Sequence, residues 1–143
     1  MKKIILSALV IVALFKAESS LAQYKINTLS AGQNLRTNNG MRSENGLFNV
    51  LLQSDGNLCV YKNGDAFIWC SMTNAKGGNN LEMQTDGNLV LYGANHSPIW
   101  STDTYRGTAD KKGSRLVIEN DGSLILYNAN NKPVWKAKDG RLY

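Results

Sequence analysis

The sequence has little of what enzymes and nucleic-acid-binding proteins usually display. Its only histidine, His96, falls in a predicted turn at 94–97, where we expect an exposed side chain and not a catalytic base. Its 16 basic residues exceed its 11 acidic residues by five, and the lysines are scattered over turns and the tail. Nucleic-acid binding depends on clustered positive charge, which this pattern does not provide. We therefore expect no catalytic residues and no nucleic-acid partner.

Long apolar runs are lacking except near the N-terminus. There, two lysines precede a twelve-residue apolar run from Ile4 to Phe15, and a stretch of small residues ends at Ala22. This pattern predicts a secretory signal peptide cleaved after Ala22. The alternative, an uncleaved anchor, is disfavoured because a membrane span needs ~20 apolar residues. We expect residues 1–22 to be removed and residues 23–143 to be secreted as one domain without a membrane span.

Cysteine is scarce as well, and Cys59 and Cys70 are the only two. An even number of cysteines in a secreted chain favours a disulfide, and these two flank a predicted hairpin. Closing a loop of twelve residues stabilises a fold by roughly 3 kcal/mol in the chain-entropy model. The alternative is a pair of free thiols in apolar positions.

Uninterrupted helical segments are missing too. Thirteen glycines all follow residue 31, and nine of them lie in N-G, D-G and G-G pairs between short β-branched and aromatic runs, which predicts an all-β fold. Pro98 and Pro133 stand where strands are expected to begin, a place where a missing N–H is tolerated. Residues 23–39 are expected to add one outer strand.

The sequence does contain a threefold repeat. Its nine-residue copies are box one (QSDGNLCVY, 53–61), box two (QTDGNLVLY, 84–92) and box three (ENDGSLILY, 119–127). A tryptophan follows each box eight residues after its tyrosine, at Trp69, Trp100 and Trp135. One such unit cannot bury its own apolar face. The repeats, at about 24–72, 73–105 and 106–143, are therefore expected to share one core around the tryptophans.

Each repeat predicts three strands, with the D-G turn of its box between the first two. We expect them at 47–53, 57–62 and 67–71 with a turn at 63–66, then at 81–84, 88–93 and 99–102, and finally at 115–119, 123–128 and 134–137. Residues of one parity share a strand face. If Tyr61 pairs with Ile68, then Val60 faces Trp69 on an apolar face, and the opposite face is polar.

The polar face calls for an explanation beyond the turn. An Asp and a Gly serve turn geometry, but a turn does not require the Gln two residues before the Asp or the Tyr six residues after it. Together with the Asn, these side chains form a cluster of hydrogen-bond donors and acceptors beside an aromatic edge. The cluster predicts a site for a neutral ligand with many hydroxyl groups.

The boxes resemble the Q-x-D-x-N-x-V-x-Y signature of bulb-type (monocot, snowdrop-agglutinin-like) mannose-binding lectins. The resemblance implies a β-prism II fold of three four-stranded sheets with pseudo-threefold symmetry. It also implies calcium-independent binding of terminal mannose on glycans and glycoproteins, with no metal or other cofactor. In such sites the Asp and Asn hold the 2-hydroxyl, the Gln reaches the 3-hydroxyl, the Tyr donates to the 4-hydroxyl and the Val packs on the ring.

Carried onto this chain, the resemblance gives three unequal sites. Box two is complete, box one has Cys59 in place of Val so that a disulfide there would lie on the sugar face, and box three has Glu119 for Gln and Ser123 for Asn, which predicts weak or lost binding. The residues are Gln84, Asp86, Asn88, Val90 and Tyr92 in box two, Gln53, Asp55, Asn57, Cys59 and Tyr61 in box one, and Glu119, Asp121, Ser123, Ile125 and Tyr127 in box three.

Two further expectations concern partners. Single shallow sugar sites bind weakly, so we expect a homodimer or higher homo-oligomer that engages several sugars at once. By analogy with the family, the tail after Trp135 is a candidate for strand exchange with a partner. The competing function is a β-prism protein that has lost sugar binding and acts through protein contacts.

Overall fold

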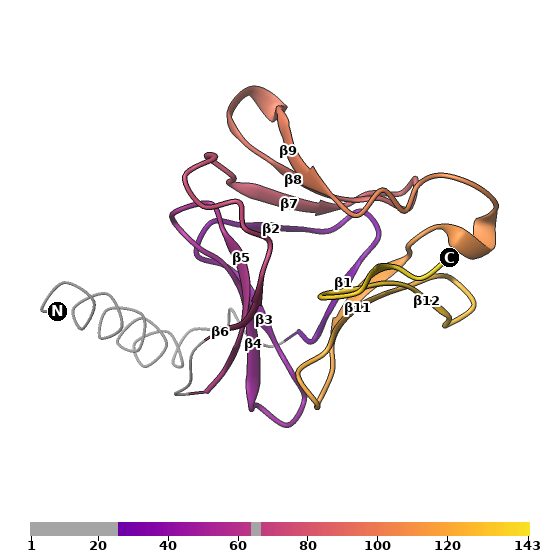
Figure 1. Cartoon of the computed structure of the whole chain (residues 1–143), viewed down its shortest axis with the longest axis horizontal. Coiled ribbons are helices and arrows are strands. Elements are labelled where there is room, and N and C mark those ends of the chain that lie inside the picture. Colours follow the sequence, from indigo (N-terminus) through magenta and orange to yellow (C-terminus); the bar gives the residue numbers. More distant parts are fainter. Residues whose placement is uncertain (1–25, 64–66) are drawn as a thin grey trace, which may run out of the picture.

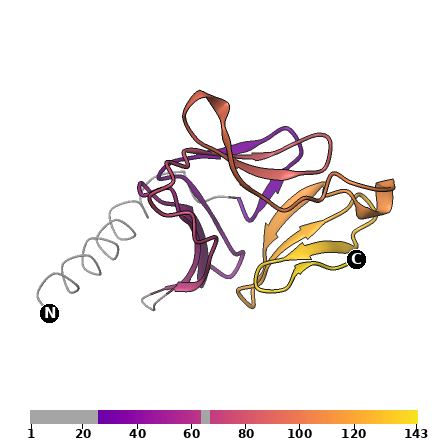
Figure 2. The same cartoon turned by 45° about the horizontal axis from the view of Figure 1, so that its top comes forward.

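A computed structural model describes residues 26–63 and 67–143. Three antiparallel sheets form the three sides of a triangular prism (Figure 1), and a view tilted by 45° shows the same three sides (Figure 2). The prediction of an all-β prism is confirmed. Within the described residues, helix is limited to two short 3₁₀ turns, η2 (Ala94–His96) and η3 (Ala109–Lys111), and no helix is long and apolar enough to cross a membrane. The predicted signal peptide and most of the turn at 63–66 lie outside these residues.

Each repeat supplies three consecutive strands, as its alternating pattern predicts. They are β4 (Phe48–Leu52), β5 (Leu58–Lys62) and β6 (Phe67–Cys70), then β7 (Asn80–Met83), β8 (Leu89–Tyr92) and β9 (Pro98–Ser101), then β10 (Arg115–Ile118), β11 (Leu124–Tyr127) and β12 (Pro133–Lys136). The two prolines begin β9 and β12, as expected.

The N-terminal segment differs from the prediction of one outer strand at 23–39, because two short strands lie in the described part of that range and a third follows it directly. They are β1 (Thr28–Ser30), β2 (Asn34–Arg36) and β3 (Gly40–Arg42), which join the sheets of repeats three, two and one respectively. The chain turns between them at Gly32 and Asn38, both of which have positive φ. The segment thereby ties all three sheets together.

The C-terminal tail adds a strand that the threefold pattern does not predict. β13 (Gly140–Arg141) pairs with β12 of the same chain, and Leu142 N donates to Val134 O at 3.0 Å. The third sheet therefore has five strands, while the other two have the expected four.

Cross-strand register brings the tryptophans together. Trp69 faces Val60 as predicted, but Tyr61 pairs with Phe67 and not with Ile68, because a β-bulge follows Val60. The other two repeats contain the same bulge before Tyr92 and Tyr127. The ring centroids of the three tryptophans lie 5.7–6.3 Å apart around the prism axis. Buried leucines from all three sheets complete this core.

Candidate functional site

The turn of each box is fixed by its aspartate. Asp86 Oδ1 accepts a hydrogen bond from the backbone N–H of Asn88 at 2.9 Å, and Asp55 and Asp121 make the same bond in their boxes. The glycine between the two residues has a left-handed φ, +99° at Gly87. Because only one carboxylate oxygen is used by the turn, the other remains available to a ligand.

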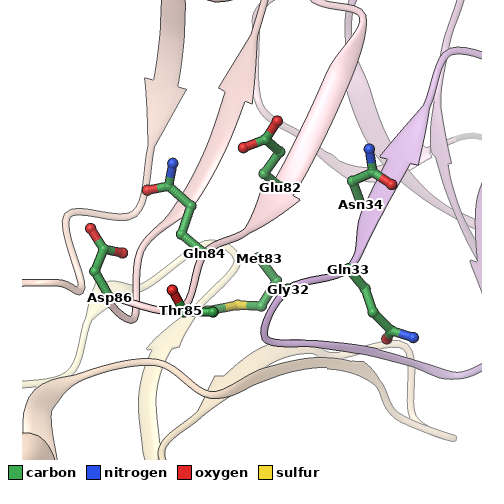
Figure 3. A pocket seen from close by; sticks show the side chains of 8 residues that line it. All are labelled: Gly32, Gln33, Asn34, Glu82, Met83, Gln84, Thr85 and Asp86. Carbon is green, nitrogen blue, oxygen red and sulfur yellow. The ribbon is translucent and has the colours of Figure 1, made fainter.

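Box two forms a shallow depression on the face of its sheet opposite the tryptophans. The depression has a volume of about 280 Å³, and all five predicted side chains of the box line it. Figure 3 shows Gln84 and Asp86 projecting from the end of β7 and from the turn that follows it. Sequence reasoning did not include the other lining residues, which are Pro98, Ser101, Asp103 and Tyr105.

A hydrogen bond between the two ends of box two orients its phenol. Gln84 Nε2 donates to the hydroxyl of Tyr92 at 2.7 Å. An amide N–H can only donate, so the phenol accepts here and keeps its own hydrogen for another acceptor. Gln84 itself lines the depression, and this bond uses only one of its two amide N–H groups. This pair therefore offers a ligand both donors and an acceptor.

Two threonines orient the amide of Asn88. Its Oδ1 accepts from the hydroxyl of Thr102 and from the backbone N–H of Thr104, both at 3.3 Å. Thr104 in turn donates its hydroxyl hydrogen to Gly87 O at 2.7 Å. With the oxygen held by the protein, the Nδ2 donor of Asn88 is left for a ligand. The sequence signal for this support is a W-x-[ST]-x-T pattern, which our sequence reasoning missed.

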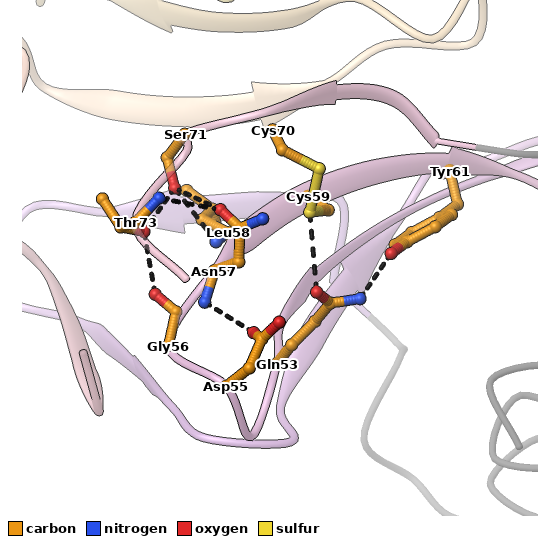
Figure 4. Close-up of a disulfide and its surroundings, with 10 residues drawn as sticks. All are labelled: Gln53, Asp55, Gly56, Asn57, Leu58, Cys59, Tyr61, Cys70, Ser71 and Thr73. Atoms are coloured by element: carbon orange, nitrogen blue, oxygen red, sulfur yellow. Dashed lines mark hydrogen bonds between the residues drawn. A yellow bond between two sulfur atoms is a disulfide. The ribbon is translucent and has the colours of Figure 1, made fainter. Parts of the chain in front are cut away.

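Box one repeats this arrangement (Figure 4). Asn57 Oδ1 accepts from Ser71 Oγ and from Thr73 N, each at 3.1 Å. Gln53 Nε2 again donates to the hydroxyl of Tyr61. Burial raises the pKa of Tyr61, so its phenol stays protonated and able to donate at neutral pH. The polar groups of boxes one and two are thus placed alike.

The two cysteines form a disulfide beneath box one. Cys59 and Cys70 are paired directly across β5 and β6, with their Cα atoms 4.2 Å apart. Gln53 Oε1 lies 3.7 Å from Cys59 Sγ, so the bridge lies on the polar face of the sheet (Figure 4). It stands where box two has Val90 and Ser101. The bridge therefore gives box one an apolar base of its own.

Box three inverts the hydrogen bond between its ends. The hydroxyl of Tyr127 donates to Glu119 Oε1 at 2.7 Å, since a carboxylate can only accept. Burial first, and then this hydrogen bond and the charge of Glu119, raise the pKa of Tyr127 to about 12. The guanidinium of Arg115 lies over the phenol ring, 4.9 Å from its centroid. The phenol hydrogen that box two leaves for another acceptor is used within the protein here.

Box three also lacks the support of the central amide. Ser123 stands in place of the Asn, and the two hydroxyl positions of the W-x-[ST]-x-T pattern are Ala137 and Asp139. The backbone N–H of Asp139 donates to Lys136 O at 3.1 Å, where Thr104 N donates to an Asn side chain. The ligand group and its support are therefore absent together.

His96 has a closer relation to box two than its turn position suggests. Its side chain is 63% exposed, as predicted, yet its ring stacks on Tyr92 with centroids 3.8 Å apart and planes at 11°. His96 Nε2 also lies 3.2 Å from Glu82 Oε1. This contact brings the turn at 94–97 against the phenol of box two. Within the described residues, no group of three His, Cys, Asp or Glu side chains is placed to hold a metal ion.

Solved lectin structures are similar to this one. The monomeric monocot mannose-binding lectins from Gastrodia elata match this structure with a TM-score of 0.68 and 30% sequence identity, over 80% of this chain and 98% of that chain. The mannose-specific agglutinin of snowdrop (Galanthus nivalis), complexed with methyl-α-D-mannoside, has a TM-score of 0.62 and 32% sequence identity, over 72% of this chain and 90% of that chain. A lectin of Marasmius oreades has a TM-score of 0.70 and 26% sequence identity, over 79% of this chain and 91% of that chain. No protein-family model and no curated protein sequence matches this chain.

Proposed function

This chain belongs to the bulb-type mannose-binding lectins, and from that premise we propose that it binds terminal mannose on glycans through box two and box one, as a secreted, calcium-independent protein. One observation carries the proposal. The five side chains that the sequence singles out in box two line a single depression.

The 2-hydroxyl of mannose would be held by Asp86 and Asn88. One oxygen of Asp86 fixes the turn, which leaves the other to accept the hydrogen of this hydroxyl. The oxygen of Asn88 is held by Thr102 and Thr104, which leaves its N–H groups to donate to the hydroxyl oxygen. A hydroxyl that both donates and accepts is fully paired by this combination.

The remaining groups would hold the rest of the ring. Gln84 reaches the 3-hydroxyl, and Tyr92, whose oxygen already accepts from Gln84, donates to the 4-hydroxyl. Val90 offers an apolar surface to ring carbons. Since the hydrogen bonds involve only protein groups and sugar hydroxyls, binding needs no calcium ion. We expect a chelator to leave the affinity for mannose unchanged, and loss of binding in EDTA that calcium restores would contradict this.

The test of the site is the double variant D86A/N88A. We expect it to lose mannose binding at box two, because each lost hydrogen bond to a sugar hydroxyl costs about 1–3 kcal/mol. A ¹⁵N NMR titration with methyl α-mannoside resolves the amides around Gly87 from those around Gly56, so box one serves as an internal reference.

The matched control is D121A, which removes the same turn bond from box three and should leave the mannose titration of boxes one and two unchanged. Wild-type shifts around Gly87 that persist in D86A/N88A would exclude box two as the site. A wild-type protein that binds no mannosylated glycan would favour the competing function, a β-prism that acts through protein contacts.

Secretion and assembly complete the proposal. The Cys59–Cys70 disulfide suits an oxidising compartment, which supports removal of residues 1–22 on export. A shallow sugar site binds on the order of millimolar, and joining several sites raises avidity by about 10²–10⁴. We propose a homodimer or higher oligomer on this ground. Light scattering on the secreted protein tests the assembly, and a monomer would contradict it.

A further inference from the structure

A second, larger depression adjoins box two. It has a volume of about 560 Å³ and lies over β2 and β7, and we call it the β2–β7 groove. Gln84 and Asp86 line both depressions, so the groove is continuous with box two. Figure 3 shows Glu82 between Gln84 and Asn34 on the exposed face of these strands. A ligand in box two that is longer than one sugar would therefore extend over Glu82 and Asn34.

Hydrogen bonds hold the polar side chains of the groove in place. Glu82 Oε1 accepts from Asn80 Nδ2 at 2.6 Å and lies 3.2 Å from His96 Nε2. Asn34 Nδ2 donates to Asn80 Oδ1 at 2.9 Å. These contacts leave Glu82 Oε2 and Asn34 Oδ1 as acceptors. Two acceptors in fixed positions match a ligand that carries several hydroxyl donors.

The polar groove is peculiar to the second sheet. Strand register places Leu51 and Val117 in the positions that correspond to Glu82, and Gly40 and Thr28 in those that correspond to Asn34. The prism is built in the other two sheets without a carboxylate at this point. Glu82 and Asn34 are therefore not required by the fold, and they adjoin the one box that keeps its full set of side chains.

We propose that the β2–β7 groove binds the second sugar ring of a neutral oligosaccharide whose terminal mannose occupies box two. The inference rests on the proposed function. Residues two apart on one strand are separated by about 6.6 Å, so Glu82 lies roughly one ring beyond Gln84. Among the residues that line the groove, all of them described, acidic side chains occur and Lys and Arg do not. Anionic sugars are therefore disfavoured.

The experiment compares methyl α-mannoside with the α1,2-, α1,3- and α1,6-linked mannobioses in ¹⁵N NMR titrations of the secreted protein. At box two, at least one mannobiose should bind about tenfold more tightly than the monosaccharide, the gain expected from one or two added hydrogen bonds. Box one, which has Leu51 beside it, should show no such preference. The variant E82L places beside box two the leucine that lies beside box one, Leu51. The variant N34T introduces the threonine that stands at the corresponding position of the third sheet, Thr28.

Both variants should bind the monosaccharide as the wild type does and should lose the preference for the mannobiose at box two. The inference would be overturned if box two of the wild type bound the monosaccharide and every mannobiose with equal affinity. It would also be overturned if the preference for the mannobiose survived in both variants, or if a variant lost affinity for the monosaccharide as much as for the mannobiose. In these cases mannose binding itself, and with it the proposed function, would stand. If no sugar changed the NMR chemical shifts at either box, both the inference and the proposed function would be overturned.

Discussion

At the scale of the residue, one substitution decides the direction of a hydrogen bond. In boxes one and two a Gln donates to the Tyr, whereas in box three Tyr127 donates to Glu119. The exchange of an amide for a carboxylate thus removes from box three both a donor and a free phenol hydrogen. This single change of side-chain group separates a Gln–Tyr pair that keeps hydrogen-bonding groups for a ligand from a Glu–Tyr pair whose phenol hydrogen is bonded within the protein.

The variant E119Q should lower the pKa of Tyr127 from about 12 toward its ordinary value near 10, because it removes the negative charge that favours the protonated phenol and supplies an amide that can donate to the phenol oxygen, as Gln84 does to Tyr92. The raised pKa means that the folded state holds this proton more tightly than the unfolded state. Its contribution to stability is therefore present below pH ~10 and is lost as the pH rises toward ~12. Ultraviolet titration of tyrosinate, with Y127F identifying the transition, measures the shift. An unchanged transition in E119Q would contradict the assigned hydrogen bond.

The sequence predicts which residues belong to each box, since spacing and strand parity place them on one face. It does not predict the stacking of His96 on Tyr92, because that contact depends on the conformation of the turn at 94–97. Asn95 and His96 both have positive φ there, which residue types alone do not reveal.

At the scale of the element, the segment that follows the tryptophan-bearing strand serves the preceding box in repeats one and two. Thr102 and Thr104 follow β9, yet their hydrogen bonds go to Asn88 and Gly87 in the turn between β7 and β8. A three-stranded hairpin unit is therefore the smallest element that can hold a complete box.

The variant T102V should weaken mannose binding at box two by about three- to tenfold, because Asn88 loses one of the two bonds that orient it. T102S is the matched control, since box one has Ser71 in this place, and it should bind as the wild type does. Site-resolved NMR titration with methyl α-mannoside distinguishes them. If T102V bound as tightly as T102S, the support would be irrelevant to binding.

The double variant E119Q/S123N should not restore mannose binding to box three, because Ala137 and Asp139 cannot hold the new amide. The reciprocal change in box two, Q84E/N88S, should abolish binding there. The same NMR titration, followed around Gly122 and Gly87, reports both. Binding at box three of E119Q/S123N comparable to that at box two would show that ligand side chains suffice without their support.

The elements themselves were largely predictable, and the exceptions have physical causes. Alternating apolar residues and D-G turns located the nine strands of the repeats, because both signals are local. The bulges before each Tyr and the three short strands β1, β2 and β3 were not predicted. Both depend on pairing with strands distant in sequence, which no local pattern encodes.

At the scale of the whole molecule, the turns of the boxes also join the sheets. Gly87 lies against the next repeat, and Gly113 N donates to Gly87 O at 2.9 Å. A Cβ at Gly87 would come within 2.7 Å of Lys112 Cβ and 3.0 Å of Gly113 N. Gly56 meets Gly78 in the same way, and Gly122 meets Phe48 of the first repeat. The three turns therefore close the prism into a ring.

The variant G87A should lower the free energy of unfolding by about 1–3 kcal/mol, because alanine is strained at φ +99° and its methyl group collides with the neighbouring sheet. Urea denaturation measures the change. G32A is the matched control, since Gly32 also has positive φ but no atom within 4 Å of an added Cβ, and it should cost less. Equal losses in the two variants would mean that backbone strain alone matters and that the contact between sheets does not.

The triangular arrangement has a consequence for how the protein meets a cell. The strands of boxes one and two belong to different sides of the prism (Figure 1). A flat, glycan-coated surface touches one side of a prism at a time, so the second box of a bound molecule faces away from that surface. With mannose binding as proposed, a single chain is therefore suited to bridging two surfaces and clumping particles, and losing either box would leave adhesion intact while abolishing agglutination by the monomer.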